Sequence, residues 1–234
     1  MTSMLGQRGS AGNVQPRRDR SLPNRTVHLV REPGHTGTAT GDRRVRRTRQ
    51  ALIGALVELV LEKRYDAITI QNLLDRADVG RATLYAHYRG KDDLLLRSFE
   101  GLLEALDRDM DRGGAPSRRL APARELFHHV GQMEEFHRAL GRAHMLDRVY
   151  QAATNALSQS IARRLAGLPG ATPTDSAALP ALAHGFAGAL FAMLRWWVDH
   201  DTPCSPERMD DLYHTHLARS ATDWSKTTNG ETGV

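Results

Sequence analysis

The sequence predicts an all-α protein in which a three-helix domain precedes a larger helical bundle. From about residue 46 onward, apolar side chains recur at the three- and four-residue spacing of amphipathic helices, and no alternating strand pattern interrupts them. Apolar residues make up 40% of the 234 positions, which is enough for a real core. Breaks rich in Gly and Pro separate the expected helices, and we place the domain boundary between residues 105 and 106.

The two ends of the chain differ from the rest. Residues 1–42 are rich in Gly, Pro, Ser, Thr and Arg and bury too little to offset ordering entropy, so we expect a disordered basic tail. Residues 226–234 are expected to be a flexible tail. Residues 1–50 hold eleven arginines and three acids, whereas the whole chain has a net charge of only +5. Such a leader favours an anionic partner such as DNA, although it can also be a solubilising tail.

Composition disfavours several other classes of protein. No uninterrupted run of 18 apolar residues occurs, so we expect no membrane span, and the N-terminus lacks the apolar stretch of a secretory signal. The single cysteine, Cys204, fits a cytoplasmic protein without disulfides. The eleven histidines lack a close pair with a neighbouring acid, so we expect no metal and no cofactor.

The N-terminal domain, residues 43–105, begins with a helix expected over residues 46–63. Five arginines precede or open it, although positive charge at a helix N-terminus opposes the macrodipole. Phosphate is the natural partner for such a cluster, and we expect Arg46 and Arg47 to contact DNA. The alternative is a solvated leader.

A helix–turn–helix pattern follows. Thr69 suits an N-cap, and the apolar residues of 70–77 lie on one helical face. A turn at residues 78–80 leads to a helix expected from Arg81 to Tyr88, with Leu84 and Tyr88 on its inner side. The fourth helix starts near Lys91, where the acids after it suit the helix dipole.

These residues resemble the DNA-binding domain of the TetR family of bacterial regulators over about residues 45–105. The matching positions are Thr69, Ala77-Asp78-Val79-Gly80, Thr83-Leu84-Tyr85-Ala86-His87-Tyr88 and Lys91. Asp78 stands where the family has Gly, and Gly80 stands where it has Ser. Asp tolerates a left-handed backbone, whereas Gly80 removes a hydroxyl cap and one phosphate contact.

The resemblance implies two sets of DNA contacts. The phosphate contacts would come from Thr69, Thr83, Tyr85, His87 and Lys91. The base contacts would come from Gln71, Arg81 and Ala82, and Arg81 would suit guanine. The alternative for Tyr85 and His87 is that they are only packing residues.

The region of residues 106–225 is expected to be a helical dimerisation and ligand domain. We place helices near residues 119–131, 133–139, 143–167, 176–199 and 206–224, separated by Gly and Pro breaks. The last two would pair with their copies in a dimer. Small residues and one tryptophan mark the expected dimer face: Gly185, Gly188, Ala189, Ala192 and Trp196. The alternative is that the small residues only fit neighbours in the same chain.

A group of aromatic and methionine residues suggests a ligand pocket in this domain. The candidates are Phe127, Met133, Phe136, Met145 and Tyr150. Such a group can line an apolar pocket, but at helical spacing it is more often plain core.

The resemblance implies a dimeric DNA-binding regulator, in its simplest form a repressor that a small-molecule ligand releases from a palindromic operator. An activator of the same family would carry the same motif. A rival from another class is a helical His-dependent enzyme with an incidental helix-turn-helix, although no catalytic arrangement of residues supports it. A third alternative is an interaction module that has lost DNA binding. We therefore expect the chain not to be an enzyme, and we expect its partners to be double-stranded DNA, a second copy of itself and a small-molecule effector.

Overall fold

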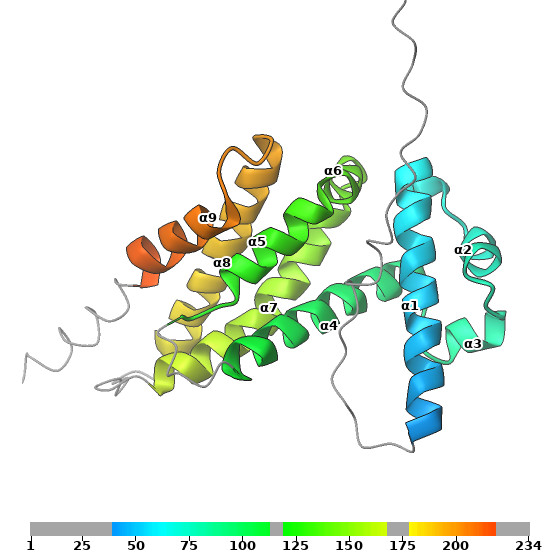
Figure 1. The fold of residues 1–234 in the computed structure, drawn as a ribbon, viewed down its shortest axis with the longest axis horizontal. Helices are drawn as coiled ribbons and strands as arrows, with labels where there is room; N and C mark the ends of the chain where they lie inside the picture. The colour runs from blue at the N-terminus through cyan, green and yellow to red at the C-terminus, as the bar shows by residue number, and fades with distance from the viewer. Residues whose placement is uncertain (1–38, 113–118, 168–177, 219–234) are drawn as a thin grey trace, which may run out of the picture.

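The computed structural model describes residues 39–112, 119–167 and 178–218 (Figure 1). Every regular element within these ranges is helical, as predicted. The elements are α1 (Ala39–Glu62), η2 (Tyr65–Ala67), α2 (Ile70–Ala77), α3 (Arg81–Tyr85), α4 (Lys91–Arg112), α5 (Ala123–Gln132), α6 (Glu134–Arg142), α7 (Met145–Ala166), α8 (Ala178–Asp199), α9 (Pro206–Leu212) and η3 (Tyr213–Ala218). Most of the predicted basic tail and all of the predicted C-terminal tail lie outside these ranges.

Two groups of helices lie at opposite ends of the molecule, with α4 running from one to the other (Figure 1). One group consists of α1, α2 and α3, and the other consists of α5 to α9. The predicted boundary at residue 105 falls inside the continuous helix α4. The two groups of helices therefore share one continuous helix.

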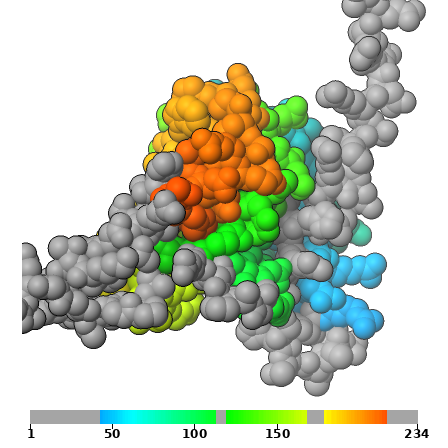
Figure 2. Space-filling view, turned by 60° about the vertical axis from the view of Figure 1, so that its left-hand side comes forward, coloured from blue at the N-terminus to red at the C-terminus, as the bar shows by residue number. Residues whose placement is uncertain are grey.

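The first helix begins at Ala39, well before the expected residue 46. It packs against α2, α4 and α6, and its Leu52, Leu56 and Leu59 are buried. The N-terminal part of α1, which carries the arginines of residues 43–49, thus lies beyond the part that packs against other helices through buried apolar side chains. In Figure 2 this part of α1, in blue, projects from the body of the molecule.

Local signals set the helix–turn–helix geometry. Thr69 caps α2 in a capping box: its hydroxyl accepts from the Asn72 N–H, and the Asn72 side chain accepts from the Thr69 N–H. Asp78 adopts the left-handed conformation with φ 51° and ψ 49°, as the turn requires. Gly80 is the N-cap of α3 and supplies no side-chain bond. The predicted cap at Thr69, the left-handed backbone at Asp78 and the missing side-chain cap at Gly80 are confirmed.

The expected length of α3 is wrong, because the helix ends at Tyr85 rather than at Tyr88. The amides of His87 and Tyr88 both donate to the Leu84 carbonyl, which tightens the chain into a turn. The turn places the Tyr88 side chain in the core, where it is buried together with Leu84. The predicted burial of Leu84 and Tyr88 is therefore confirmed, although only Leu84 lies in α3.

The bundle differs from the expected boundaries at several points. Helix α5 starts at Ala123 instead of residue 119, because Pro122 disfavours helical backbone at the residue before it. Helix α6 extends to Arg142. After α9 ends at Leu212, the chain continues as a π-helical segment, so a single α-helix over residues 206–224 is wrong where the structure describes it.

Helix α8 is long and apolar enough to cross a membrane by length and hydropathy alone, although the sequence was expected to contain no such segment. In the structure it packs along α7. Its Leu190, Leu194 and Trp197 are buried against the rest of the bundle. The face of α8 that carries these residues is apolar because it forms part of the core of the bundle.

Candidate nucleic-acid interface

The short helix α3 presents its polar side chains on one side. Arg81, Ala82 and Thr83 are exposed, and the ring of Tyr85 is 50% exposed, an unusual placement for a large aromatic residue. Leu84, which lies between them in the sequence, is fully buried. The outward set has no packing function to explain its residue types, so it is free to contact a partner.

The guanidinium of Arg81 is held by α2. Its Nη2 donates to Gln71 Oε1 at 3.2 Å, and Gln71 Nε2 donates to Asp75 Oδ1 at 2.7 Å. The structure thus brings together two of the three residues predicted to contact bases. It adds Asp75, which the sequence analysis did not single out.

The ammonium group of Lys91 is engaged within the chain. Lys91 Nζ donates to the carbonyls of Tyr65 and Ile68 at 2.7 and 2.8 Å and lies 4.5 Å from the centre of the Tyr65 ring. Lys91 therefore fixes the segment just before α2 onto the start of α4. These two bonds use two of the three N–H donors of the ammonium group, and the phosphate contact stays a prediction.

The other predicted phosphate contacts lie near the same surface. Thr69 is exposed, and its hydroxyl oxygen accepts a bond from Asn72, which leaves the hydroxyl proton free to donate. His87 is half-buried and forms an edge-on contact with the Tyr88 ring. Arg46 and Arg47 are exposed on the projecting part of α1.

A polar network that sequence reasoning missed ties this surface to the bundle. Tyr65 donates to Asp92 Oδ1 at 2.7 Å, and Arg148 of α7 donates to Asp92 Oδ2 at 2.6 Å. Burial alone would raise the pKa of Asp92, but the bonds from Tyr65 and Arg148 outweigh it and lower that pKa. Burial and the bond to Asp92 raise the pKa of the Tyr65 hydroxyl. The charged form of Asp92 is therefore favoured at this junction.

The residues predicted to line a ligand pocket are mostly core. Phe127, Phe136, Met145 and Tyr150 are buried, and Met133 is half-buried and packed against the core. Tyr150 stacks on Phe191 of α8, and its hydroxyl has no hydrogen-bond partner among the residues that the structure describes. None of the five lines the groove described next.

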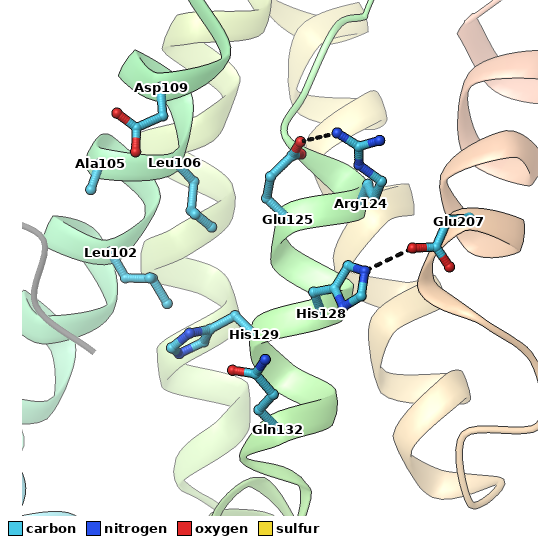
Figure 3. Close-up of a pocket in the computed structure, with 10 residues that line it drawn as sticks. All are labelled: Leu102, Ala105, Leu106, Asp109, Arg124, Glu125, His128, His129, Gln132 and Glu207. Atoms are coloured by element: carbon cyan, nitrogen blue, oxygen red, sulfur yellow. Dashed lines mark hydrogen bonds and ion pairs between the residues drawn. The ribbon is translucent and has the colours of Figure 1, made fainter. Parts of the chain in front are cut away.

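A groove of about 600 Å³ lies between α4, α5 and α9 (Figure 3). Three apolar side chains and Asp109 of α4 line one wall, and polar side chains of α5 and α9 line the other. His128 of α5 contacts Glu207 of α9 at 2.7 Å and so links these two helices beside the groove. The lining residues are Leu102, Ala105, Leu106, Asp109, Arg124, Glu125, His128, His129, Gln132 and Glu207.

The predicted dimer-face residues lie along one outward stripe of α8. Gly185, Ala192 and Trp196 are exposed, and Gly188 and Ala189 are half-buried. A side-chain carbon added at Gly185 or Gly188 would meet nothing within 4 Å. The alternative that these glycines fit neighbours in the same chain is therefore wrong among the described residues.

Known proteins share both the domain and the whole fold. The uncharacterized HTH-type transcriptional regulator YxbF of Bacillus subtilis strain 168 is 46% identical over 55 residues, which are 23% of this chain and 14% of YxbF. A TetR-family regulator structure from Syntrophomonas wolfei has a TM-score of 0.55 at 17% identity and covers 76% of this chain and 96% of its own. RolR in complex with resorcinol has a TM-score of 0.50 at 16% identity and covers 82% and 98%. These structural likenesses show a shared fold.

The fold and the exposed surface of α3 define a helix-turn-helix domain. Residues 52–97 match the family model of the bacterial regulatory proteins of the tetR family. These residues therefore carry the helix-turn-helix segment of that family, and the relatives that match this part of the chain are described as HTH-type transcriptional regulators. The enzyme alternative is therefore discarded.

Proposed function

We propose that this protein is a cytoplasmic, sequence-specific DNA-binding repressor that acts as a homodimer and is released by a small-molecule effector. The observation that carries the proposal is the exposed polar face of α3, with Arg81 held in place and the Tyr85 ring half exposed. Of the five residues of this helix, only Leu84 is buried. Its side chains suit the edges of bases and the phosphates beside them.

The proposed contacts divide into two kinds. Arg81 and Ala82 would face bases, and Thr83, Tyr85 and His87 would face phosphates. Thr69 and Lys91 would hold phosphates at the flanks, where the free amides at the start of α4 can share one of them. The exposed arginines of α1 would add salt-dependent affinity that is independent of sequence.

The dimer would form through the outward stripe of α8. Its small residues allow a second helix to approach closely, and Trp196, 49% exposed, would supply apolar area at one end of the stripe. A two-fold dimer places two copies of α3 on one face of the DNA, so the operator should be roughly palindromic. Gly185→Leu tests this face, because it should dissociate the dimer in sedimentation analysis without unfolding the chain.

The effector would bind in the groove between α4, α5 and α9. The α4 wall is mainly apolar and the other wall offers hydrogen-bonding groups, which suits a small amphipathic molecule. RolR, which has a similar fold, is described in complex with resorcinol. Because the groove wall and Lys91 both belong to α4, an occupant that shifts α4 would also shift the recognition helix.

The proposal is tested by selecting bound sites from random DNA with the purified full chain. We expect a roughly palindromic site and affinity that falls steeply with salt. Tyr85→Phe should weaken binding to all sequences, whereas Arg163→Ala, an exposed arginine of α7, should change nothing. Failure to enrich any sequence, with no salt-sensitive binding, would overturn DNA recognition. Transcription from a promoter that overlaps the selected site then separates repression from the activator alternative.

A further inference from the structure

A chain of two hydrogen bonds runs over the outer surface from α2 to the recognition helix. It joins Asp75 to Gln71 within α2, and Gln71 to Arg81 at the start of α3. All three side chains are exposed. These bonds compete with water, so they contribute little to the stability of the fold. Their effect is on where the Arg81 guanidinium lies.

The order of donors and acceptors fixes the direction of the Gln71 amide. A carboxylate can only accept hydrogen bonds, so Asp75 draws the NH₂ group of Gln71 toward itself. The carbonyl oxygen of Gln71 then faces Arg81, which can only donate. Without Asp75, the bond to Arg81 alone would orient the amide.

The bond from Gln71 leaves Arg81 able to bind a base. The guanidinium has five N–H donors, and the structure shows one of them in use. Two parallel donors therefore remain for a planar acceptor pair, such as O6 and N7 of guanine in the major groove. A side chain that is already held loses less freedom on binding, which strengthens the contact with the matching base.

We propose that Asp75, Gln71 and Arg81 form a relay that positions the Arg81 guanidinium to read guanine in the operator half-site. The inference rests on the proposed function in DNA binding. It changes the expected part of Gln71, which the family resemblance assigned to a base. Gln71 becomes a positioning residue, because its carbonyl oxygen accepts from Arg81 and its NH₂ group donates to Asp75.

The test is the base preference of variants, measured by selection from random DNA followed by binding to single-base variants of the selected site. Arg81→Ala should lose discrimination for guanine at one position of each half-site by about 5- to 150-fold. Gln71→Ala should lose about two- to tenfold at that same position and nowhere else. Gln151→Ala, an exposed glutamine of α7, is the matched control and should behave as wild type.

Two further variants separate positioning from base contact. Gln71→Ala in the Arg81→Ala background should add no further loss, because the relay acts only through Arg81. Asp75→Asn should reduce the preference for guanine and also raise affinity for unrelated DNA, because it removes a negative charge near the phosphates. A purely structural role would instead lower affinity for all sequences together.

The inference is overturned if Gln71→Ala changes the preference at a different base position, which would make Gln71 itself a reader. It is equally overturned if the losses of Gln71→Ala and Arg81→Ala are additive. Failure of the proposed function looks different, because the wild-type chain would then select no sequence at all. If the wild type selects sites and the Gln71→Ala variant has the same preference at every base, the relay is wrong but the proposed function stands.

Discussion

The N-terminal domain and the helical bundle use the same residue types in opposite ways. In the N-terminal domain, the aromatic and polar residues of α3 face outward, and Tyr85 is half exposed. In the bundle, the aromatic and methionine residues that suggested a pocket face inward, and Phe127 is fully buried. The outward stripe of α8 consists mainly of small residues.

This contrast teaches that residue type alone does not identify a site. On a helix of five residues, one buried leucine fixes which side faces out, so the outward set can be inferred directly. A long bundle helix packs against several neighbours, and helix α7 contacts α4, α6 and α8. An aromatic residue there has a buried position available in most directions.

The largest expected effect comes from truncating one aromatic residue in each region. Phe127→Ala should lower the free energy of unfolding by about 3–5 kcal/mol, because it removes a buried ring that packs edge-on against Trp197. Tyr85→Ala should change stability by no more than about 0.5 kcal/mol, because its ring is on the surface. Denaturant unfolding measures both.

The expected results for DNA binding are the reverse, since Tyr85→Ala should lose operator affinity and Phe127→Ala should retain it while folded. A loss of less than about 1 kcal/mol for Phe127→Ala would contradict the assignment to core and restore the predicted pocket.

A second pair compares two histidines. His137 is buried between Phe99 and Phe136, and burial lowers its pKa from 6.5 to about 4. In the window between these values the unfolded chain binds the proton and the folded chain does not. Stability is therefore fully present above about pH 6.5 and is lost as the pH falls toward 4, by at most about 3 kcal/mol.

Unfolding measured from pH 7 to pH 4 tests this assignment. His137→Leu should flatten the slope relative to wild type, whereas His87→Ala, at a half-buried position beside α3, should leave it in place. An unchanged slope in His137→Leu would show that other groups produce the acid sensitivity.

The same contrast explains how far the sequence could predict the structure. The Thr69 cap, the left-handed Asp78 and the inner pair of Leu84 and Tyr88 follow from signals within a few residues, and all were predicted. The bonds of Lys91 to the carbonyls of Tyr65 and Ile68 were not, because those partners lie 26 and 23 positions away.

The link from Arg148 to Asp92 spans 56 positions and was missed for the same reason. No periodicity within one helix could have indicated either contact. The groove between α4, α5 and α9 likewise depends on how three helices meet, which their separate patterns do not determine.

The smallest expected effect compares two glycines, one from each region. A side-chain carbon added at Gly131 would lie 2.9 Å from the Trp197 ring, whereas one at Gly80 would meet only the Thr83 hydroxyl at 4.0 Å. The Trp197 ring cannot easily move away, since it packs against Phe127 and its Nε1 donates to the Cys204 carbonyl.

Gly131→Ala should therefore destabilise the chain by about 1–3 kcal/mol, although alanine is the better helix former. Gly80→Ala should stay within about 0.5 kcal/mol, because Gly80 has an ordinary negative φ of −69°. Tryptophan fluorescence during unfolding, to which Trp197 contributes, measures the stability of the first variant, with Gly188→Ala on the open face of α8 as its control. Gly131→Ala as stable as wild type would show that the close approach of α5 and α8 does not constrain the bundle. The bundle and the N-terminal domain would then differ less in tightness of packing than the buried rings imply.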